Sequence, residues 1–542
     1  MKKPLLLTAL PLRLGRRVAV GLLAVMLALA STIIHQTVVR AAAGDLDPTF
    51  GNGGKIMTYP GSVNALAIQP DGKIIAAGPA GSEISGMAVT RYNPDGSTDL
   101  SFGVGGKAQA GLAQAVATAV ALQSDGKIVV GGNAGDLAAQ DFALARFNPD
   151  GSLDPTFGIG GRVITDFFGY KDTLTALVIQ PDGKIAVAGS AFHEPQKYDF
   201  ALARYDASGN LDVSFGIGGK AVTDFFNNDD YDEVAGMALQ ADGKIVAAGY
   251  ANYFSRHRAA VARYTADGSL DPTFGAGGKT TTDFYASGFS EFTALSVQTD
   301  GKLVAAGWTD GAGDNEFAVA RYMASGLLDP TFGEGGKVTT GFHSDIEAAS
   351  IALQRNGKIV VGGIRLANAF DSSADFVLAR YTPTGELDPQ FGMNGIVITD
   401  FQGGADAAHA LAIQRDGKII AAGNAWVSSR NRTSVCALAR YQGDSPFDMC
   451  VQDDSNGNLL QINTTTGDYQ FTNCAGLMLG GTGTLTRRGS TITLQHNAMD
   501  RRVMATIDTS TGKATASVQL FSQGRTFGIM DRNITNNTCA CR

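Results

Sequence analysis

The stretch Leu153-Asp154-Pro155-Thr156-Phe157-Gly158 recurs along this chain with small changes. Its seven copies cover residues 46–51, 98–103, 153–158, 211–216, 270–275, 328–333 and 387–392. The aspartates that mark successive copies are 52, 55, 58, 59, 58 and 59 residues apart. Such a period indicates a tandem-repeat architecture. Because residues repeated seven times are expected to be scaffold, specificity should lie in the segments between the copies.

Each repeat contains four segments that are typical of short strands. In the third unit they cover residues 161–167, 175–180, 184–189 and 200–205. An Asp-Gly or Asn-Gly pair, which is a strong hairpin signal, stands between two of these segments in every unit. These pairs are Asp71-Gly72, Asp125-Gly126, Asp182-Gly183, Asp242-Gly243, Asp300-Gly301, Asn356-Gly357 and Asp416-Gly417. Four antiparallel strands per unit predict a propeller blade rather than a solenoid coil.

The two ends of the array complement each other. It opens with a lone strand of the last type, residues 54–59, and ends with a lone strand of the third type, residues 436–441. The N-terminal strand can therefore complete the final blade, which leaves no long exposed edge. We predict an all-β fold in which residues 44–443 form a seven-bladed β-propeller closed by the N-terminal strand. A small antiparallel β domain is predicted to follow at residues 444–542.

Three blocks of each unit carry a family resemblance. The blocks L-D-P-T-F-G-x-G-G-K, Q-P-D-G-K-I and F-A-L-A-R-Y resemble the delta-60 repeat family of bacterial exported β-propeller proteins. The resemblance covers residues 44–442. It implies a propeller in an extracellular, cell-surface or periplasmic setting, and it implies no catalytic activity that is general to the family.

Residues 1–43 have the composition of a signal peptide. Lys2, Lys3 and three arginines precede an apolar run at residues 18–34, and Ala41-Ala42-Ala43 offers a cleavage site. The rival interpretation is an uncleaved anchor, because a run of about 17 residues is at the lower limit for crossing a bilayer. We expect an exported protein without a membrane span in the mature chain.

The chain is acidic. Its formal net charge is −8, and loss of the six basic residues before position 44 leaves −14 on the mature chain. This charge disfavours nucleic acid and anionic lipid as partners. The expected partners are a glycan or a protein, and we expect a monomer.

The segment after residue 442 has no repeat. Residues 449–542 alternate Thr, Val, Leu and Ile between turn phrases, which predicts the small β domain. Four of the five cysteines lie here, and in an exported protein they predict disulfides: Cys450, Cys474, Cys539 and Cys541. Three pairings are possible, and we favour those in which Cys450 and Cys474 each form a disulfide with either Cys539 or Cys541. Cys436 is then left as a buried free thiol.

One arginine position is filled in every unit. Its members are Arg91, Arg146, Arg204, Arg263, Arg321, Arg380 and Arg440. A ring of anion-binding guanidinium groups is one interpretation. We favour the other, in which each arginine pairs with a local carboxylate, either of the Leu-Asp phrase or of the Thr-Asp-Phe phrase.

The crossovers from one blade to the next are expected to share a face with the loops between the second and third strand types, opposite the Asp-Gly turns, and both kinds of segment vary. These loops differ from unit to unit, and variable loops on a rigid frame commonly bind ligands. They are rich in aromatic residues and contain both tryptophans of the chain. Flat rings beside arginine suit a sugar or peptide surface, and the alternative is that the rings merely cover the blade ends. We predict ligand binding by Tyr198, Tyr253, Phe254, Arg256, Trp308 and Trp426.

Two acidic segments, residues 227–233 and 310–316, are candidate calcium loops because calcium prefers oxygen ligands. Their candidate ligands are Asp229, Asp230, Asp232, Asp310 and Asp314. Neither segment has the spacing of a known calcium loop, so a solvated acidic loop is the favoured interpretation. A third set of aspartates follows the last-type strands: Asp166, Asp224, Asp283 and Asp400. We favour the interpretation that they accept turn amides, and the alternative is a bound ion in some of the blades.

No catalytic residue is predicted, because the chain has no nucleophile elbow, P-loop or zinc-type spacing. We therefore expect a non-catalytic, exported propeller that acts as a binding or structural surface protein through its variable loops. The alternative is a secreted carbohydrate-active enzyme, a hydrolase or lyase, with a site on the same loops. A hydrolase needs two carboxylates roughly 5 to 10 Å apart. Candidates are Asp230, Glu233, Glu291, Asp345 and Asp406.

Overall fold

The computed structural model describes residues 42–535. Within this range the description leaves out residues 59–60, 80–85, 138, 195–196, 227–230, 312, 342–343, 369–370, 428–433, 445–448, 454–457, 463–467, 474–477, 483, 489–490, 498–500, 509–512 and 521–524. Residues 1–41, which hold most of the predicted signal peptide, lie outside the described residues. All the regular elements of the described chain are β-strands.

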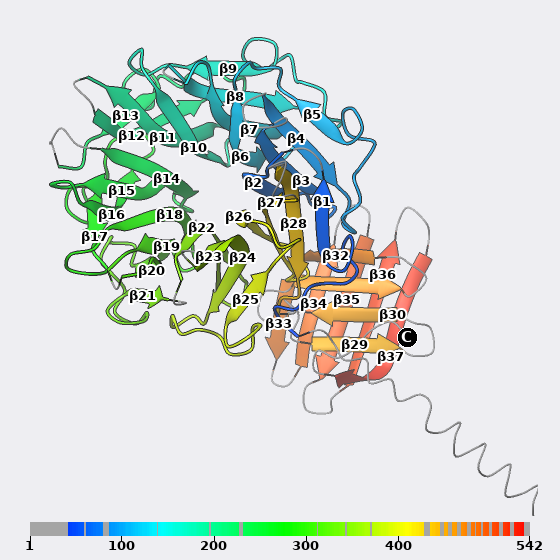
Figure 1. The fold of residues 1–542 in the computed structure, drawn as a ribbon. Helices are drawn as coiled ribbons and strands as arrows, with labels where there is room; N and C mark the ends of the chain where they lie inside the picture. Colours follow the sequence, from blue (N-terminus) through cyan, green and yellow to red (C-terminus); the bar gives the residue numbers. More distant parts are fainter. Residues whose placement is uncertain are drawn as a thin grey trace, which may run out of the picture. The chain divides into compact units, whose positions relative to one another are not determined.

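Residues 42–444 form seven four-stranded antiparallel sheets arranged around one axis (Figure 1). From the innermost strand outward, blade 1 holds β2 (Ala65–Ile68), β3 (Ile74–Pro79), β4 (Met87–Tyr92) and β5 (Lys107–Gln109), and blade 2 holds β6 (Val116–Leu122), β7 (Ile128–Ala134), β8 (Asp141–Phe147) and β9 (Arg162–Thr165). Blade 3 holds β10 (Asp172–Ile179), β11 (Ile185–His193), β12 (Lys197–Tyr205) and β13 (Lys220–Thr223), and blade 4 holds β14 (Asp232–Leu239), β15 (Ile245–Asn252), β16 (His257–Tyr264) and β17 (Lys279–Thr282). Blade 5 holds β18 (Ser290–Val297), β19 (Leu303–Thr309), β20 (Glu316–Tyr322) and β21 (Lys337–Thr340), and blade 6 holds β22 (Ile346–Leu353), β23 (Ile359–Asn368), β24 (Asp371–Tyr381) and β25 (Ile396–Thr399). Blade 7 holds β26 (Asp406–Ile413), β27 (Ile419–Trp426), β28 (Ser434–Tyr441) and the N-terminal β1 (Lys55–Thr58).

The ring closes as predicted. β1 pairs with β28 in antiparallel register, with Lys55 opposite Ala439 and Thr58 opposite Cys436. The Arg440 N–H also donates to the Gly54 carbonyl (2.9 Å). The seven-bladed, all-β fold class is thus confirmed, and the closing blade joins the two ends of the array.

The hydrophobic core lies between neighbouring blades. One cluster combines Val129 and Leu144 of blade 2 with Ile185, Val187 and Ala203 of blade 3. Because successive side chains of a strand point to opposite faces, each middle strand supplies two such interfaces. This pattern explains why the middle strands are almost wholly apolar.

Each innermost strand except β2 has a β-bulge, where one extra residue stands opposite the neighbouring strand. In β6 the extra residue is Thr118, whose hydroxyl donates to the Leu174 carbonyl of the next blade (2.7 Å). Thr175 and Thr293 make the same contact to the blades that follow them. The bulge therefore turns a side chain toward the adjacent blade and ties the inner strands together.

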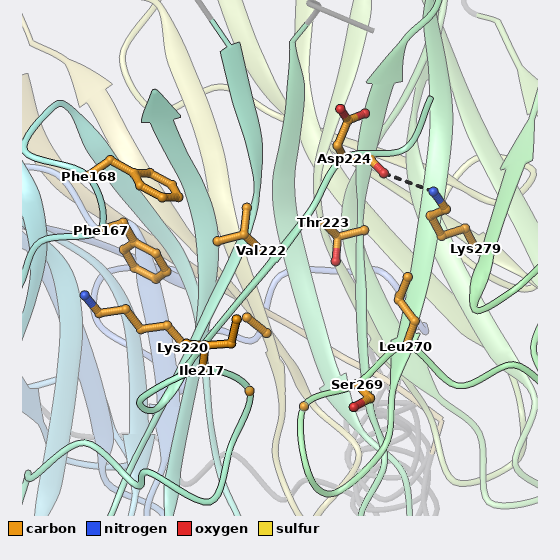
Figure 2. A pocket seen from close by; sticks show the side chains of 13 residues that line it. Phe167, Phe168, Ile217, Lys220, Val222, Thr223, Asp224, Ser269, Leu270 and Lys279 are labelled. Atoms are coloured by element: carbon orange, nitrogen blue, oxygen red, sulfur yellow. Dashed lines mark hydrogen bonds between the residues drawn. The ribbon is translucent and has the colours of Figure 1, made fainter. Parts of the chain in front are cut away.

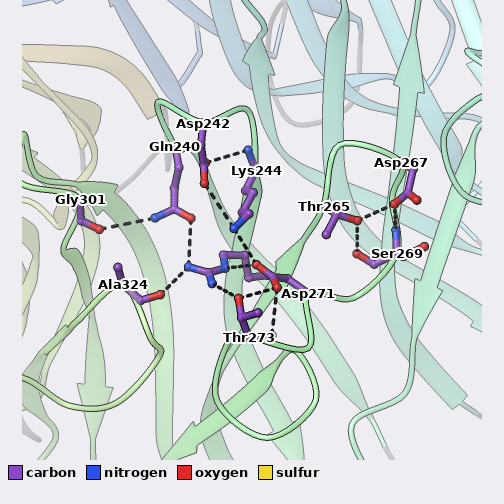
Figure 3. A network of polar contacts seen from close by, with 11 residues as sticks. Gln240, Asp242, Lys244, Thr265, Asp267, Ser269, Asp271, Thr273, Gly301 and Ala324 are labelled. Carbon is purple, nitrogen blue, oxygen red and sulfur yellow. Dashed lines mark hydrogen bonds and ion pairs between the residues drawn. The ribbon is translucent and has the colours of Figure 1, made fainter.

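The seven arginines pair with the marker aspartates of the Leu-Asp phrase, which confirms the favoured prediction and identifies the partner. Arg263 on β16 is typical: Nε donates to Asp271 Oδ2 (2.9 Å) and Nη2 to Thr273 Oγ1 (3.1 Å). Lys244 Nζ lies 3.1 Å from the same aspartate oxygen (Figure 3). The Arg263 and Asp271 side chains are 5 % and 4 % exposed, so the guanidinium group is structural and not exposed to an anionic ligand.

The same arginines link successive blades. Arg263 Nη1 donates to the Ala324 carbonyl (2.5 Å) beyond β20 in blade 5 (Figure 3). Five other arginines reach a carbonyl of the following blade in the same way. Arg380 is the exception, because its Nη2 lies 3.1 Å from the carboxylate of Asp444, where the chain leaves the array. Asp444 thus anchors the exit segment to blade 6.

Acid is expected to unfold the propeller steeply between about pH 4 and pH 2. Burial raises the pKa of Asp47, but hydrogen bonds from Lys418 and Thr49 outweigh it and lower that pKa from 3.8 to about 2. A carboxyl whose pKa is depressed by folding stabilises the fold above the unfolded-state pKa, and this contribution disappears as the pH falls through the folded-state pKa. The pKa values of the other six marker aspartates are lowered as well. Denaturant titrations at pH 5, 4, 3 and 2 check this, and a free energy of unfolding that stays constant over that range would contradict it.

Residues 449–535 contain one nine-stranded antiparallel sheet. Its strands, in spatial order, are β32 (Met478–Thr482), β31 (Asp468–Asn473), β30 (Asn458–Ile462), β29 (Met449–Asp453), β37 (Arg525–Thr535), β36 (Lys513–Leu520), β35 (Arg501–Asp508), β34 (Thr491–Asn497) and β33 (Thr484–Arg488). Cys474, Cys539 and Cys541 lie outside the described residues, as does the side chain of Cys450. The predicted disulfides are therefore still a prediction, whereas Cys436 is a free, partly buried thiol. The described residues include no helix long and apolar enough to cross a membrane.

Candidate binding surface

The strand order places two kinds of variable segment on one face of the ring. Because neighbouring strands are antiparallel, the second-to-third-strand loops and the crossovers between blades share this face, which we call the loop face. The Asp-Gly turns and the repeated Leu-Asp-Pro-Thr-Phe-Gly turns lie on the opposite face. The repeated sequences thus build one face, and the sequences that vary build the other.

Exposed rings are concentrated on one part of the loop face. Across the described residues, every exposed aromatic side chain falls between positions 168 and 289, on the crossovers and loops of blades 2 to 5. We call this set the aromatic patch: Phe168, Tyr170, Tyr231, Tyr253, Phe254 and Phe289. Phe254 is the most open of them, at 81 % exposed.

A second layer of rings supports the patch. Tyr198 stacks on Tyr231, with ring centroids 5.7 Å apart, and packs edge-on against Phe192 at 5.0 Å. Tyr253 packs on Phe226 at 4.8 Å and on Phe254 at 4.5 Å. These offset and edge-to-face arrangements are the favourable ones for aromatic pairs. The supporting rings therefore fix the exposed rings in position.

The backbone at Phe254 is strained. Phe254 and Ser255 have φ values of 52° and 59°, and non-glycine residues rarely adopt this left-handed conformation. A tight turn holds it, with the Tyr253 N–H donating to the Arg256 carbonyl (2.9 Å). Strain of this kind is often found at functional sites.

Arg256, which the sequence predicts as a ligand-binding residue, is occupied by backbone acceptors. Its guanidinium donates to the carbonyls of Tyr285 (2.8 Å), Ala286 (2.8 Å) and Gly288 (2.9 Å). It also forms an ion pair with Asp283 (3.3 Å). Arg256 thus positions the crossover that carries Phe289.

The two tryptophans are not among the exposed rings of the patch. Trp308 is on β19 of blade 5, opposite Glu291 in register, and Trp426 ends β27 in blade 7. Both side chains are partly buried. Of the six predicted ligand-binding residues, the structure groups Tyr198, Tyr253 and Phe254 in the patch or beneath it.

Sequence reasoning missed the crossover rings, Phe168, Tyr170, Tyr231 and Phe289. The strand order predicted that the crossovers share a face with the second-to-third-strand loops and vary as they do, but aromatic residues were sought only in the loops. The usable signal was the aromatic residues of the crossovers themselves, such as Phe168 and Tyr170 after the Thr-Asp-Phe phrase.

Three glutamates stand beside the patch. Glu233, Glu291 and Glu347 occupy the same register position on the innermost strands of blades 4, 5 and 6. The pKa of Glu347 is raised, mainly by burial and next by the charge of Glu291. The pKa of Glu233 is also raised by burial, and its carboxylate interacts with Tyr250 and with the charge of Glu291. His257 Nδ1 lies 2.5 Å from Glu291 Oε1, and its ring stacks on Tyr250 at 4.2 Å. The patch thus borders an acidic, partly buried centre.

The predicted calcium-loop residues have separate locations. Asp310 Oδ1 accepts the Phe289 N–H (2.5 Å) and so supports the Phe289 crossover. Asp229 and Asp230 lie outside the described residues. Asp232 is buried at the start of β14, where it accepts the backbone N–H groups of Phe225 and Asn252. The structure does not bring Asp232 and Asp310 into one group of metal-ligating side chains.

A pocket of about 760 Å³ lies along the outermost strand β13, between Phe167 and Phe168 on one side and Lys279 on the other (Figure 2). Both of its lysines are engaged by backbone acceptors. Lys279 Nζ donates to the Asp224 carbonyl (3.0 Å), and Lys220 Nζ donates to the Asp166 carbonyl. They hold the crossover ends in place.

Solved structures similar to this chain share less than a seventh of its sequence. Sqt1 from Chaetomium thermophilum is 12 % identical over 74 % of this chain and 100 % of its own, with a TM-score of 0.42. Hydrazine synthase from Kuenenia stuttgartiensis is 11 % identical over 72 % of this chain and 98 % of its own, with a TM-score of 0.42. A streptogramin B lyase is 12 % identical over 67 % of this chain and 93 % of its own, with a TM-score of 0.32.

Among curated proteins, none matches the chain. One family model matches seven times in tandem, at residues 69–102, 123–157, 180–215, 240–274, 298–332, 354–391 and 414–448. Each match contains the Asp-Gly or Asn-Gly turn between the first two strands of a blade and one arginine of the buried pairs, so it falls once in every repeat found in the sequence. These seven matches confirm the resemblance to β-propeller repeats of the delta-60 kind. Through residues 69–448 the chain belongs to the family described as "Domain of unknown function (DUF5122) beta-propeller".

Proposed function

We propose that this chain is an exported binding protein whose aromatic patch contacts a glycan. One observation carries the proposal: the exposed aromatic side chains of the described residues gather on one face of four consecutive blades. The repeated blocks, which are alike in all seven blades, do not account for such an uneven distribution. Fixed rings offer large contact area at low entropic cost. The composition of residues 1–43 supports export.

The surroundings of the patch favour a sugar over an apolar ligand. Flat rings can cover the C–H faces of a sugar ring, while carboxylates accept hydrogen bonds from its hydroxyl groups. Glu291 and His257 provide such polar groups next to Phe289. A groove for an apolar ligand would instead lack charged groups.

Replacing Tyr253 and Phe254 together with alanine is expected to weaken glycan binding at least about tenfold, as for loss of a central aromatic contact. A glycan array probed with the wild-type protein identifies the ligand, and calorimetry then compares the variants. The matched control is Ile217→Ala, which removes an exposed apolar side chain from the opposite face. Equal affinity of the Y253A/F254A variant and the wild type would refute the proposal.

The same screen separates binding from catalysis. Glu233 and Glu291 are the carboxylates that would serve a hydrolase, because their environments differ and the two charges interact. Product analysis of each glycan that binds shows whether it is cleaved. Cleavage that disappears in Glu233→Gln would assign hydrolysis to this face in place of binding alone.

A further inference from the structure

Three aspartates converge at the junction between blades 2 and 3. Asp141 begins β8, Asp166 follows β9, and Asp172 begins the innermost strand of the next blade, β10. Each carboxyl group brings one oxygen to within 4.8 Å of the other two. Segments up to 31 positions apart in sequence thus place three acidic groups at one point of the loop face.

Asp172 has an unsatisfied oxygen at this point. The side chain is fully buried, and its Oδ2 accepts the Phe167 N–H (2.8 Å). Its Oδ1 has no hydrogen-bond partner among the described residues. A buried carboxylate oxygen normally has a hydrogen bond, a positive partner or a metal ion.

No described lysine, arginine or histidine forms an ion pair with these three carboxylates. The nearest cation, Lys220, uses its Nζ on the backbone carbonyl of Asp166 and lies over the Phe167 ring (5.2 Å). Asp166 Oδ1 accepts the Gly169 N–H (2.6 Å), as predicted for this residue, which leaves its other oxygen for the cluster. The cluster therefore has three carboxyl groups and no ion pair, although the charge of Lys220 acts on Asp141 and Asp172.

The junction between blades 4 and 5 shows how the same positions look when a cation is built in. The three equivalent residues there are Arg258, Asp283 and Ser290. Arg258 donates to both carboxylate oxygens of Asp283, from Nε (3.0 Å) and Nη2 (2.8 Å). A guanidinium thus occupies the place of the first carboxylate, and the third carboxylate has become a serine.

Other junctions fall between these two cases. Between blades 3 and 4 the triad Asp199, Asp224 and Asp232 has Lys197 Nζ 2.9 Å from Asp224 and His193 Nε2 2.7 Å from Asp199. Between blades 6 and 7 the triad Asp375, Asp400 and Asp406 recurs with Arg365 4.0 Å from Asp375. Only the triad between blades 2 and 3 is without such an ion pair in the described structure.

We propose that Asp141, Asp166 and Asp172 bind a calcium ion that links blade 2 to blade 3. The ligand set consists of hard carboxylate oxygens that lie within 4.8 Å of one another. A point between three oxygens at that separation is about 2.8 Å from each, so a small inward movement of the side chains brings all three to the Ca–O distance of about 2.3–2.6 Å. Magnesium, with its shorter bonds and stricter octahedral geometry, fits this spread less well. The ion supplies the counter-charge that Arg258 supplies two junctions further on.

Calorimetric titration of EDTA-stripped full chain with CaCl₂ tests the site. The wild type is expected to bind calcium and to unfold at a higher temperature with calcium than with EDTA, because an ion that binds only the folded state stabilises it. Asp172→Asn is expected to bind one ion fewer than the wild type. Equal stoichiometry in the two proteins, or no calcium binding by the wild type, would overturn the proposal, and so would tighter binding of MgCl₂.

Asp283→Asn is the matched control. It changes the equivalent of Asp166 at the junction with the built-in guanidinium, so it should destabilise the fold without changing the number of calcium ions bound. Should Asp172→Asn fail to fold, Asp141→Asn replaces it, because Asp141 is only partly buried and the same loss of one ion is expected. Full calcium stoichiometry in Asp141→Asn would then overturn the site.

Discussion

Replacing Arg440 with alanine is expected to lower the free energy of unfolding by about 3–5 kcal/mol, the usual range for removing one partner of a buried ion pair. Arg440 lies on β28, and its Nε donates to Asp47 Oδ2 (2.8 Å). Its Nη1 donates to the Pro94 carbonyl of blade 1, and Nη2 to Thr49 Oγ1 (3.0 Å). The side chain therefore holds three distant parts of the chain where the ring closes.

The loss is large because Asp47 stays behind. Its side chain is 2 % exposed, and only Lys418, at 3.0 Å, would remain as a cationic partner. Arg440 also covers the Phe50 ring at 4.6 Å, so the truncation opens space beside a buried aromatic side chain. Urea unfolding at pH 7 measures the change through the midpoint and slope of the transition.

A double variant distinguishes a buried charge from a packing defect. Arg440→Met with Asp47→Asn removes both charges while keeping most of the volume, and it is expected to recover more than half of the loss. If the double variant is as unstable as Arg440→Ala, packing rather than the stranded carboxylate would account for the effect. A loss below about 1 kcal/mol in Arg440→Ala would mean that the pair contributes no more than a surface ion pair.

The blade, the closure and the pairing of each arginine with a local carboxylate could be predicted because each depends on residues that recur in a fixed order, whereas the choice of the Leu-Asp aspartate as partner came from the structure. The Asp182-Gly183 pair determines its hairpin through local turn chemistry. The closure could be predicted because β1 is a lone strand and only the final blade lacks one. The carboxylate triad could not be predicted in the same way. Asp141, Asp166 and Asp172 belong to three segments, and their approach depends on how a crossover folds across a blade junction. Thr118 likewise reaches the next blade only because a bulge turns it, and a bulge leaves no pattern in a single strand.

A glycine that packs closely against the innermost strand of each blade shows the same limit. In each blade, a glycine ends the apolar run of the second strand. From composition alone, this glycine indicates either crowding between strands or a nearby turn. The seven positions are Gly78, Gly132, Gly189, Gly249, Gly307, Gly363 and Gly423. A Cβ at any of them would lie 1.8–2.1 Å from a backbone carbonyl oxygen of the innermost strand or of the segment leading into it. The repeat needs glycine here because the backbone approaches closely, not because of a positive φ.

Gly132→Ala is therefore expected to cost about 3 kcal/mol or more, at or above the usual upper range for overpacking. Its Cβ would lie 1.9 Å from the Val116 carbonyl oxygen, a distance that real Cβ atoms do not show. The obstacle is backbone, so relief requires β6 and β7 to separate at the bulge. That movement would also break the hydrogen bond from Thr118 to the Leu174 carbonyl of blade 3 (2.7 Å).

The neighbouring glycine provides the control. Gly131 is on the same strand, and a Cβ there would meet only methyl groups of Leu174, Leu177 and Leu144 at 3.0–3.4 Å. Five other blades hold alanine at this position: Ala77, Ala188, Ala248, Ala306 and Ala422. Gly131→Ala is expected to change the free energy of unfolding by less than about 1 kcal/mol, because flexible side chains can shift. Urea unfolding of Gly132→Ala and Gly131→Ala tests this prediction. Equal losses in the free energy of unfolding would show that the backbone at the bulge can move to accommodate a methyl group, and that the close backbone contact is not the reason for glycine at position 132.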